Sequence, residues 1–217
     1  MRTSLARLVF PSLRWRGRTG FTHERPKIDA ALRAGVGGFI LFRAPRDAVA
    51  ALTRDLRQQA DRPLLIAADL ERGPAQQVDG LSDMPTLAAL GFVNDLDATH
   101  AVGLMTALEA RSVGIDWNFA PVCDLDLEPA NPIVQTRAFG ADPGRVGRHA
   151  AAYVRGLQEH GVLACAKHYP GHGRTTIDSH ESLPVVATPA DELRRVDGEP
   201  FVQAIRAGVG SIMTAHV

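Results

Sequence analysis

The sequence has no excess charge of either sign, since 24 lysines and arginines balance 24 aspartates and glutamates among its 217 residues. Proteins that bind nucleic acid or an anionic membrane surface usually present a net positive field, which this balance does not provide. The composition therefore predicts a small partner that is neutral or mildly charged. Neither a nucleic-acid partner nor a membrane partner is expected.

Cysteine is scarce. Only Cys123 and Cys165 occur, and both lie inside apolar segments. A thiol in such a segment is more often a small buried group than half of a disulfide or a metal ligand. The pattern predicts two free buried thiols, which fits a reducing compartment.

The N-terminal region lacks an uninterrupted apolar stretch. Each candidate stretch is broken by arginines, at Arg2, Arg7, Arg14, Arg16 and Arg18. A signal peptide needs an apolar core of about 7–15 residues, and a membrane-spanning helix needs about 20. Neither is expected here, so the protein is predicted to be cytoplasmic.

Six apolar runs of strand length recur along the chain. They lie at residues 5–10, 37–42, 63–69, 114–121, 161–170 and 210–217. Segments with helical periodicity separate most of them, at Lys27–Ala34, Pro45–Ala60, Leu96–Ser112, Pro143–His160 and Pro189–Ala207. Such alternation predicts βαβ units and a parallel sheet. No low-complexity tract or linker divides the chain, so a single domain is expected.

Glycines close several predicted helices just before the next strand. Gly35, Gly114, Gly161 and Gly208 stand at these junctions. Glycine adopts the left-handed backbone conformation of a C-terminal helix cap without a steric penalty. The repeated junction therefore predicts four left-handed caps.

The loops that follow the predicted strands are long and polar, whereas the opposite connections are short. This asymmetry predicts one functional face at the C-terminal ends of the strands, as in a (β/α)8 barrel or a doubly wound sheet. No GxGxxG or P-loop sequence follows the first strand, which argues against a nucleotide site. The predicted fold class is α/β, of the (β/α)8 TIM-barrel type but incomplete, with about six βα units, because such barrels typically need about 250 residues.

The segment richest in chemically active side chains runs from Lys167 to Pro184, with the sequence KHYPGHGRTTIDSHESLP. Lys167 and His168 stand where a parallel strand should end, so they are placed to donate hydrogen bonds to a polyhydroxylated ligand. Farther along, Asp178 precedes His180 by two residues. An aspartate there accepts a hydrogen bond from one imidazole nitrogen and leaves the other free to exchange a proton with a substrate.

Two other interpretations of this segment remain open from the residues alone. Asp-Ser-His tripeptides are common in loops, where they usually satisfy turn hydrogen bonds. A metal site is also conceivable, because imidazole and carboxylate suit zinc or iron and the segment offers His168, His172, Asp178 and His180. Their spacing matches none of the compact metal motifs, so no metal is predicted.

The order of motifs resembles family 3 of the glycoside hydrolases, specifically its bacterial β-N-acetylglucosaminidase branch. That branch carries a KH(F/Y)PGHG…DSH segment in a mobile active-site loop, which matches residues 167–180. The resemblance extends to ILF, AADLERG, GIDWNFAPVCDLD, NPIVQTRAFGADP and the terminal IMTAHV. It covers nearly the whole chain, and the combination is far more specific than any single motif.

The resemblance implies roles for individual residues. His180 would be the proton donor and acceptor, with Asp178 orienting and polarising it. The sugar pocket would be formed by Asp69, Arg137, Lys167, His168 and Met213. Asp69 ends an apolar strand, where its carboxylate can accept two sugar hydroxyls, and Arg137 follows an Asn-Pro turn as a multidentate donor. A surface ion pair is the commoner role for such charged residues, and a methionine is often a core residue.

Two departures from the family pattern bear on function. Related enzymes usually have Asp-Gln-Glu-Gly-Gly followed by an arginine that grips the sugar, whereas this chain has DLERG at residues 69–73 and Gln77 at the matching position. The family's nucleophile is an aspartate in a Ser-Asp context on a later strand, and no such segment follows His216. Residues 1–217 are therefore expected to be the N-terminal catalytic domain, truncated at its C-terminal end.

The resemblance implies a retaining hydrolase that removes terminal β-linked N-acetylglucosamine and needs no cofactor. The expected substrate is a muropeptide or chitooligosaccharide that contains this sugar, in peptidoglycan recycling. One alternative is a family 3 β-glucosidase or β-xylosidase, although those relatives generally take their acid from a second domain. The others are a phosphorylase, in which phosphate replaces water, and a truncated sugar-binding relative without catalysis.

Overall fold

The computed structural model describes residues 5–177 and 182–217, which form a parallel sheet of six strands flanked by helices. The strands are β1 (Ser12–Arg14), β2 (Gly38–Phe42), β4 (Leu65–Ala68), β6 (Trp117–Asn118), β7 (Leu163–Tyr169) and β8 (Ser211–Thr214). They lie side by side in chain order, and each neighbouring pair is parallel. A doubly wound sheet reverses its strand order at a switch point, so this order identifies the winding of a barrel.

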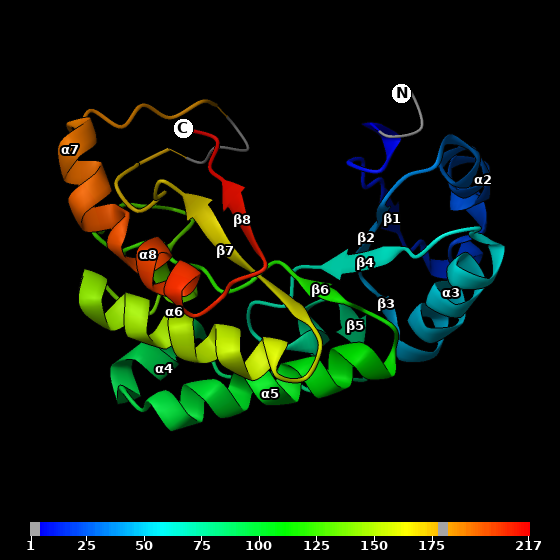
Figure 1. Ribbon diagram of the computed structural model, residues 1–217, viewed down its shortest axis with the longest axis horizontal. Helices are drawn as coiled ribbons and strands as arrows, with labels where there is room; N and C mark the ends of the chain where they lie inside the picture. The colour runs from blue at the N-terminus through cyan, green and yellow to red at the C-terminus, as the bar shows by residue number, and fades with distance from the viewer. Residues whose placement is uncertain (1–4, 178–181) are drawn as a thin grey trace.

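Helices cover the outside of this sheet, with a long helix after each of its first five strands. These are α2 (Arg25–Ala34), α3 (Arg46–Gln59), α5 (Leu96–Ser112), α6 (Pro143–Gln158) and α8 (Glu199–Arg206). In Figure 1 they form an arc around the strands, from α2 and α3 past α5 and α6 to α8. The strands β1 and β8 are the two edges of the sheet, so the described residues form an open barrel.

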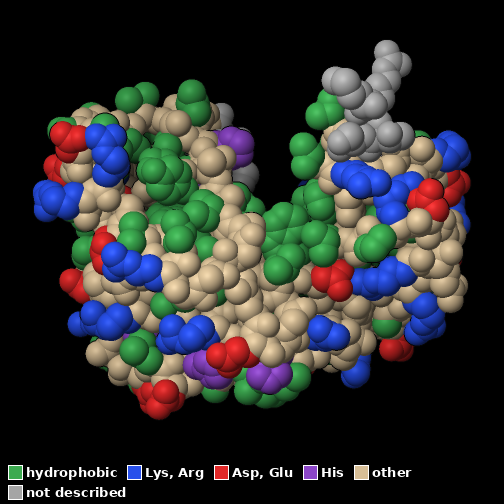
Figure 2. All heavy atoms as spheres, in the orientation of Figure 1, with side chains coloured by type: hydrophobic (Ala, Val, Ile, Leu, Met, Phe, Trp, Pro, Cys, Tyr) green, Lys and Arg blue, Asp and Glu red, His purple; other side chains and the backbone are tan. Residues whose placement is uncertain are grey.

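The strands send alternate residues to opposite faces of the sheet, as the pleat requires. In β4, Ile66 and Ala68 join the large core beneath the helices, whereas Ala67 joins a small cluster on the inner face. Cys165 of β7 joins the same inner cluster. Figure 2 shows hydrophobic side chains gathered in the hollow between the two ends of the sheet.

The predicted glycine caps are confirmed. Gly35, Gly114, Gly161 and Gly208 have φ angles of 86°, 80°, 77° and 83°, all in the left-handed region. Each lets the chain leave a helix and enter the next strand within a few residues. The short connections at this end of the barrel depend on these caps.

Helix α5 has the bounds that the periodicity predicts. It begins at Leu96 because the Asp95 carboxylate accepts hydrogen bonds from the backbone N–H groups of Asp97 and Ala98, at 2.9 and 3.1 Å.

Both cysteines are buried and free, as predicted. Among the described residues, no helix is both long enough and apolar enough to cross a membrane.

The prediction of the first strand was wrong. Residues 5–10 begin with a helical turn, and the strand follows them at Ser12–Arg14. The apolar run misleads because Leu5 and Leu8 are 67% and 78% exposed, whereas Leu13, between two polar residues, is fully buried. The pairing of β1 with β2 therefore depends on one buried side chain and on backbone hydrogen bonds.

The helix predicted over Pro189–Ala207 is interrupted. It divides into α7 (Ala190–Glu192), a wider π turn at Leu193–Asp197, and α8. Pro200 lies in the first turn of α8, where its missing N–H leaves no hydrogen bond unmade. The periodicity also missed α4 (Leu87–Val93) and the short parallel pair of β3 (Ala44–Pro45) with β5 (Val78–Asp79).

The close packing of α6 against α5 yields a stability prediction. A methyl group on Gly156 of α6 would collide with the His100 carbonyl oxygen and lie 2.9 Å from the Leu104 nitrogen, both in the backbone of α5. We expect Gly156→Ala to lower the free energy of unfolding by about 1–3 kcal/mol. Urea denaturation followed by circular dichroism measures the change.

The matched control is Gly144→Ala in the first turn of the same helix. A methyl group there meets only side-chain atoms, at 3.4 Å or more. This variant should be unchanged or more stable by up to about 1 kcal/mol, because alanine favours a helix over glycine. Equal stabilities for the two variants would contradict the close packing of α5 on α6.

Candidate active site

A cavity of about 660 Å³ opens at the C-terminal ends of the strands. All five predicted sugar-binding residues line it: Asp69, Arg137, Lys167, His168 and Met213. They come from the end of β4, from the turn after β6, and from β7 and β8. The fold thus brings together residues that lie far apart in the sequence, although their contact with a sugar stays a prediction.

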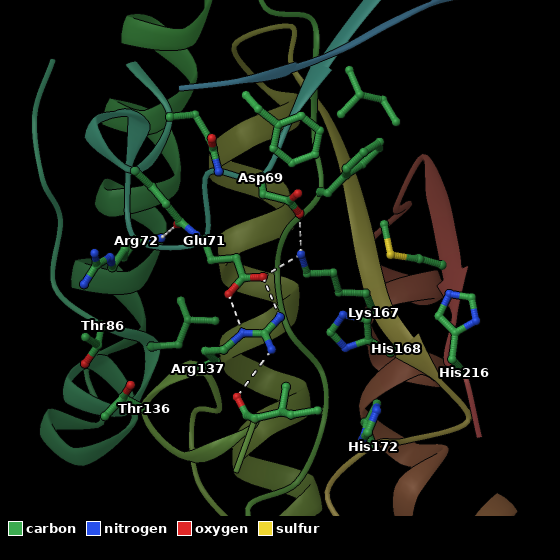
Figure 3. Close-up of a pocket in the computed structure, with 18 of the residues that line it drawn as sticks. Asp69, Glu71, Arg72, Thr86, Thr136, Arg137, Lys167, His168, His172 and His216 are labelled. Carbon is green, nitrogen blue, oxygen red and sulfur yellow. Dashed lines mark hydrogen bonds and ion pairs between the residues drawn. The ribbon is translucent and has the colours of Figure 1, made fainter. Parts of the chain in front are cut away.

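The centre of the pocket is a network of four charged side chains (Figure 3). Lys167 is only 2% exposed, and its Nζ lies 2.7 Å from Asp69 Oδ1 and 2.5 Å from Glu71 Oε1. Arg137 donates to both oxygens of Glu71, from Nε to Oε2 and from Nη2 to Oε1, each at 2.8 Å. Two cations and two carboxylates therefore neutralise each other.

The pleat of β4 explains why two carboxylates face the pocket. Asp69 and Glu71 are two residues apart and line it, while Leu70 between them is buried in the large core. The side chain of Asn118 holds Leu70 in place, because Oδ1 accepts from the Leu70 N–H at 2.9 Å and Nδ2 donates to its carbonyl at 3.3 Å. The alternation of a strand thus continues beyond Ala68.

The position of Arg137 is set by a turn after β6. The Asn131 side-chain oxygen accepts hydrogen bonds from the N–H groups of Ile133 and Val134, both at 2.8 Å. One turn of 3-10 helix follows, Gln135–Arg137. Arg137 also donates from Nη1 to the Ile133 carbonyl at 3.3 Å, so its guanidinium is held from two sides.

The electrostatics of the network keep Glu71 and Lys167 charged. Burial alone would raise the pKa of Glu71, but the Arg137 hydrogen bond and the Lys167 charge outweigh it and lower that pKa to about 2. Burial alone would lower the pKa of Lys167, yet the charges of Glu71 and Asp69 raise it above its ordinary value. The network at the centre of the pocket is therefore ionic but balanced, with two cations and two carboxylates.

His168 is held by a carboxylate that the sequence analysis did not single out. Its Nδ1 lies 2.7 Å from Oδ2 of Asp124, which is buried. Burial would raise the pKa of Asp124, but the hydrogen bond and charge of His168 lower it. In β7 the pairing shifts by one residue, since Lys167 is opposite Met213 and Tyr169 is opposite Thr214. His168 lies in that bulge.

Two residues of the site, Glu71 and Asp124, were not predicted from the sequence, and His172 was considered there only as a possible metal ligand. Glu71 is two residues beyond Asp69, so strand periodicity was the available signal. Asp124 lies in the GIDWNFAPVCDLD segment, but nothing local connects it to His168. His172 lines the cavity, is 3% exposed, and has its Nδ1 3.2 Å from the Thr175 hydroxyl.

The predicted acid/base pair, Asp178 and His180, lies outside the described residues. Within residues 5–177 and 182–217, no group of three or more histidine, cysteine, aspartate or glutamate side chains is arranged to hold a metal ion. The arrangement described here is thus one of binding: donors and acceptors converge on one cavity.

The fold and the pocket define an α/β-barrel protein with a small-molecule site at the C-terminal ends of its strands. Residues 8–217 match the model of the glycosyl hydrolase family 3 N-terminal domain. A β-hexosaminidase from Stenotrophomonas maltophilia is 39% identical over 192 residues, which are 84% of this chain and 57% of that protein. The chain belongs to glycosyl hydrolase family 3.

Solved structures agree with this assignment. A family 3 β-N-acetylglucosaminidase from Paenibacillus superposes with a TM-score of 0.90 at 34% identity, over all of this chain and 42% of that one. NagZ from Neisseria gonorrhoeae, in complex with N-trifluoroacetyl-D-glucosamine, gives a TM-score of 0.83 at 33% identity, over 96% of this chain and 63% of that one. The chain thus spans between about two fifths and two thirds of the length of these relatives.

The low pKa of Glu71 generates a pH-dependent stability prediction. Its folded pKa is about 2 against an ordinary 4.5, so the ionised form stabilises the fold above pH 4.5 and this contribution is lost as pH falls toward 2. A shift of this size corresponds to about 3 kcal/mol at neutral pH. We expect Glu71→Gln to be destabilised by roughly that amount at pH 7 and by much less at pH 3.

Urea unfolding at the two pH values, followed by tryptophan fluorescence, provides the measurement. Asp83→Asn, at an exposed carboxylate, is the control and should differ little from the parent at either pH. If Glu71→Gln loses the same stability at both pH values, Glu71 is not the ionised partner of Lys167 and Arg137.

Proposed function

We propose that this chain supplies the sugar-binding part and the acid/base pair of a retaining β-N-acetylglucosaminidase, which removes terminal β-linked N-acetylglucosamine. The observation that carries the proposal is a cavity lined by many hydrogen-bonding side chains around a charge-balanced network of Asp69, Glu71, Arg137 and Lys167. A sugar is rich in hydroxyls, so it suits a site that offers many hydrogen-bond donors and acceptors. Relatives named β-hexosaminidase and β-N-acetylglucosaminidase support the same conclusion.

The binding roles follow from counting free donors and acceptors. Lys167 uses two of its three N–H groups on Asp69 and Glu71, which leaves one for a sugar hydroxyl. Asp69 accepts from Lys167 through Oδ1, which leaves Oδ2 for a second hydroxyl. Arg137 and His168 add further contacts, and Met213 forms an apolar wall, since it packs against the inner cluster.

The proposed catalysis uses groups other than these binding residues. A carboxylate from outside this chain attacks the anomeric carbon while His180 protonates the departing oxygen, and Asp178 orients the imidazole. The same imidazole then takes a proton from water as water attacks the glycosyl-enzyme. These roles rest on the KHYPGHG…DSH motif at residues 167–180.

We infer the biological setting from the family resemblance and from the chain itself. The proposed substrate is a peptidoglycan-derived or chitin-derived oligosaccharide with a terminal N-acetylglucosamine. The two free, buried thiols support a cytoplasmic location. Residues 1–217 are proposed to belong to one catalytic domain, in line with the family match over residues 8–217.

The proposal predicts substrate preference and dependence on His180. The protein expressed from its gene should cleave an aryl β-N-acetylglucosaminide in preference to the matching glucoside. His180→Ala should lower kcat about 10²–10⁴-fold, as loss of a general acid/base does. His100→Ala is the control, because His100 lies on α5 and bonds Glu159 at 2.8 Å, away from the cavity.

Initial rates of aryl release, with and without inorganic phosphate, separate the competing functions. Faster cleavage of the glucoside would make the protein a β-glucosidase. Release that requires phosphate would make it a phosphorylase. Binding of N-acetylglucosamine without any release would make it a sugar-binding relative, and normal rates for His180→Ala would remove that histidine from the mechanism.

A further inference from the structure

We propose that Asp124 is a positioning residue that fixes the tautomer and orientation of His168, so that the Nε2 atom of His168 is presented to the sugar. The inference rests on the proposed function for its ligand. It goes beyond that function, because it assigns a role to a carboxylate that does not line the cavity. The inference is based on three hydrogen bonds that the Asp124 carboxylate accepts, all from N–H groups of His168 and His172.

The backbone brings Asp124 to this place. Beyond β6, the chain continues alongside β7, since the Lys167 N–H donates to the Pro121 carbonyl at 3.2 Å and the Cys123 N–H donates to the Lys167 carbonyl at 2.6 Å. The next residue, Asp124, therefore lies beside His168. Its side chain is fully enclosed, which a carboxylate tolerates only when it is well bonded.

The hydrogen bonds decide which imidazole nitrogen carries the proton. An ionised carboxylate is only an acceptor, so Nδ1 of His168, 2.7 Å from Oδ2, must be the donor. The other nitrogen, Nε2, is then left for a ligand. In a neutral imidazole this nitrogen is an acceptor, which complements the donors Lys167 and Arg137.

Asp124 also fixes the backbone on both sides of the turn. Its Oδ1 accepts from the N–H of His168 at 3.2 Å and from the N–H of His172 at 2.8 Å. Asn131 holds the same turn from the other side, because its Nδ2 donates to the His172 carbonyl at 2.9 Å. The orientation of the ring and the shape of the turn are thus set by one carboxylate.

Asparagine at position 124 would separate these two effects. Its amide oxygen can still accept from the two backbone N–H groups, but its NH2 group faces Nδ1 of His168 as a donor. An NH2 donor at this place requires an unprotonated Nδ1, so the imidazole proton moves to Nε2. The tautomer of His168 is then reversed, while the backbone shape of the turn is kept. Asp124→Asn is therefore the informative variant.

The test compares Asp124→Asn with the control Asp126→Asn, the same change at an exposed residue of the same segment. N-acetylglucosamine is titrated against each protein, and affinity is followed by nuclear magnetic resonance. We expect Asp124→Asn to bind about tenfold more weakly, as for a buried hydrogen bond with a mismatched partner. Asp126→Asn should bind normally.

A double-variant cycle with His168→Gln shows whether Asp124 acts through His168. If it does, Asp124→Asn adds less than about twofold to the loss already caused by His168→Gln, because the two changes are coupled. Independent losses that multiply would overturn the proposal, since a merely structural role gives that result. Normal affinity of the Asp124→Asn single variant would overturn it as well.

The tautomer itself is measured in the unaltered protein, so the proposal is tested even if Asp124→Asn does not fold. Two-bond ¹H–¹⁵N spectra of ¹⁵N-histidine-labelled protein report the protonation of each ring nitrogen, and His168→Gln identifies the signals of His168. A protonated Nδ1 is expected, with the proton moved to Nε2 in Asp124→Asn. A bare Nδ1 in the unaltered protein would overturn the assignment. Failure to bind N-acetylglucosamine would instead count against the proposed function, with the tautomer result unaffected.

Discussion

The carboxylate of Glu71 is the group on which the pocket depends. Lys167 is almost completely enclosed, and a buried cation without a partner costs several kcal/mol. Glu71 compensates Lys167 and binds Arg137 through both oxygens at the same time. Glu71 thereby joins three segments that are distant in sequence: the end of β4, the turn after β6 and the strand β7. The shape of the cavity depends on this junction.

This convergence follows from the winding of the sheet. Parallel strands in chain order place all their C-terminal ends on one side, so side chains just beyond β4 and β7 meet there. The pleat then decides which of them face inward. The alternation that turns Ala67 toward the inner cluster also turns Asp69 and Glu71 toward the cavity and Leu70 toward the helices. The positions of the charged side chains in the site thus follow from the alternation of residues along the strand.

The sequence could predict what depends on local pattern. Asp69 and Lys167 were recognisable because each is a charged residue at the end of an apolar run. The helix Leu96–Ser112 was recognisable because its helical periodicity ends just before the predicted cap at Gly114. The partner of His168 was not predictable, since Asp124 meets it only after the strands have paired. The first strand was misplaced for a related reason. The strand forms at Ser12–Arg14 because Leu13 is buried there, although the neighbouring run is more apolar. Which residues are buried is determined by the rest of the fold.

The predicted proton-transfer residues follow a turn that is anchored at both ends. Asp124 binds its beginning, at His168 and His172, and its far end is held by Arg174, whose Nε donates to both oxygens of the buried Asp197 at 3.0 and 2.9 Å. The first anchor belongs to the barrel and the second to the segment just before α8. Along the chain, this anchored turn connects His168, predicted to bind the sugar, with the predicted proton-transfer residues, so a change in either anchor is expected to affect both predicted roles.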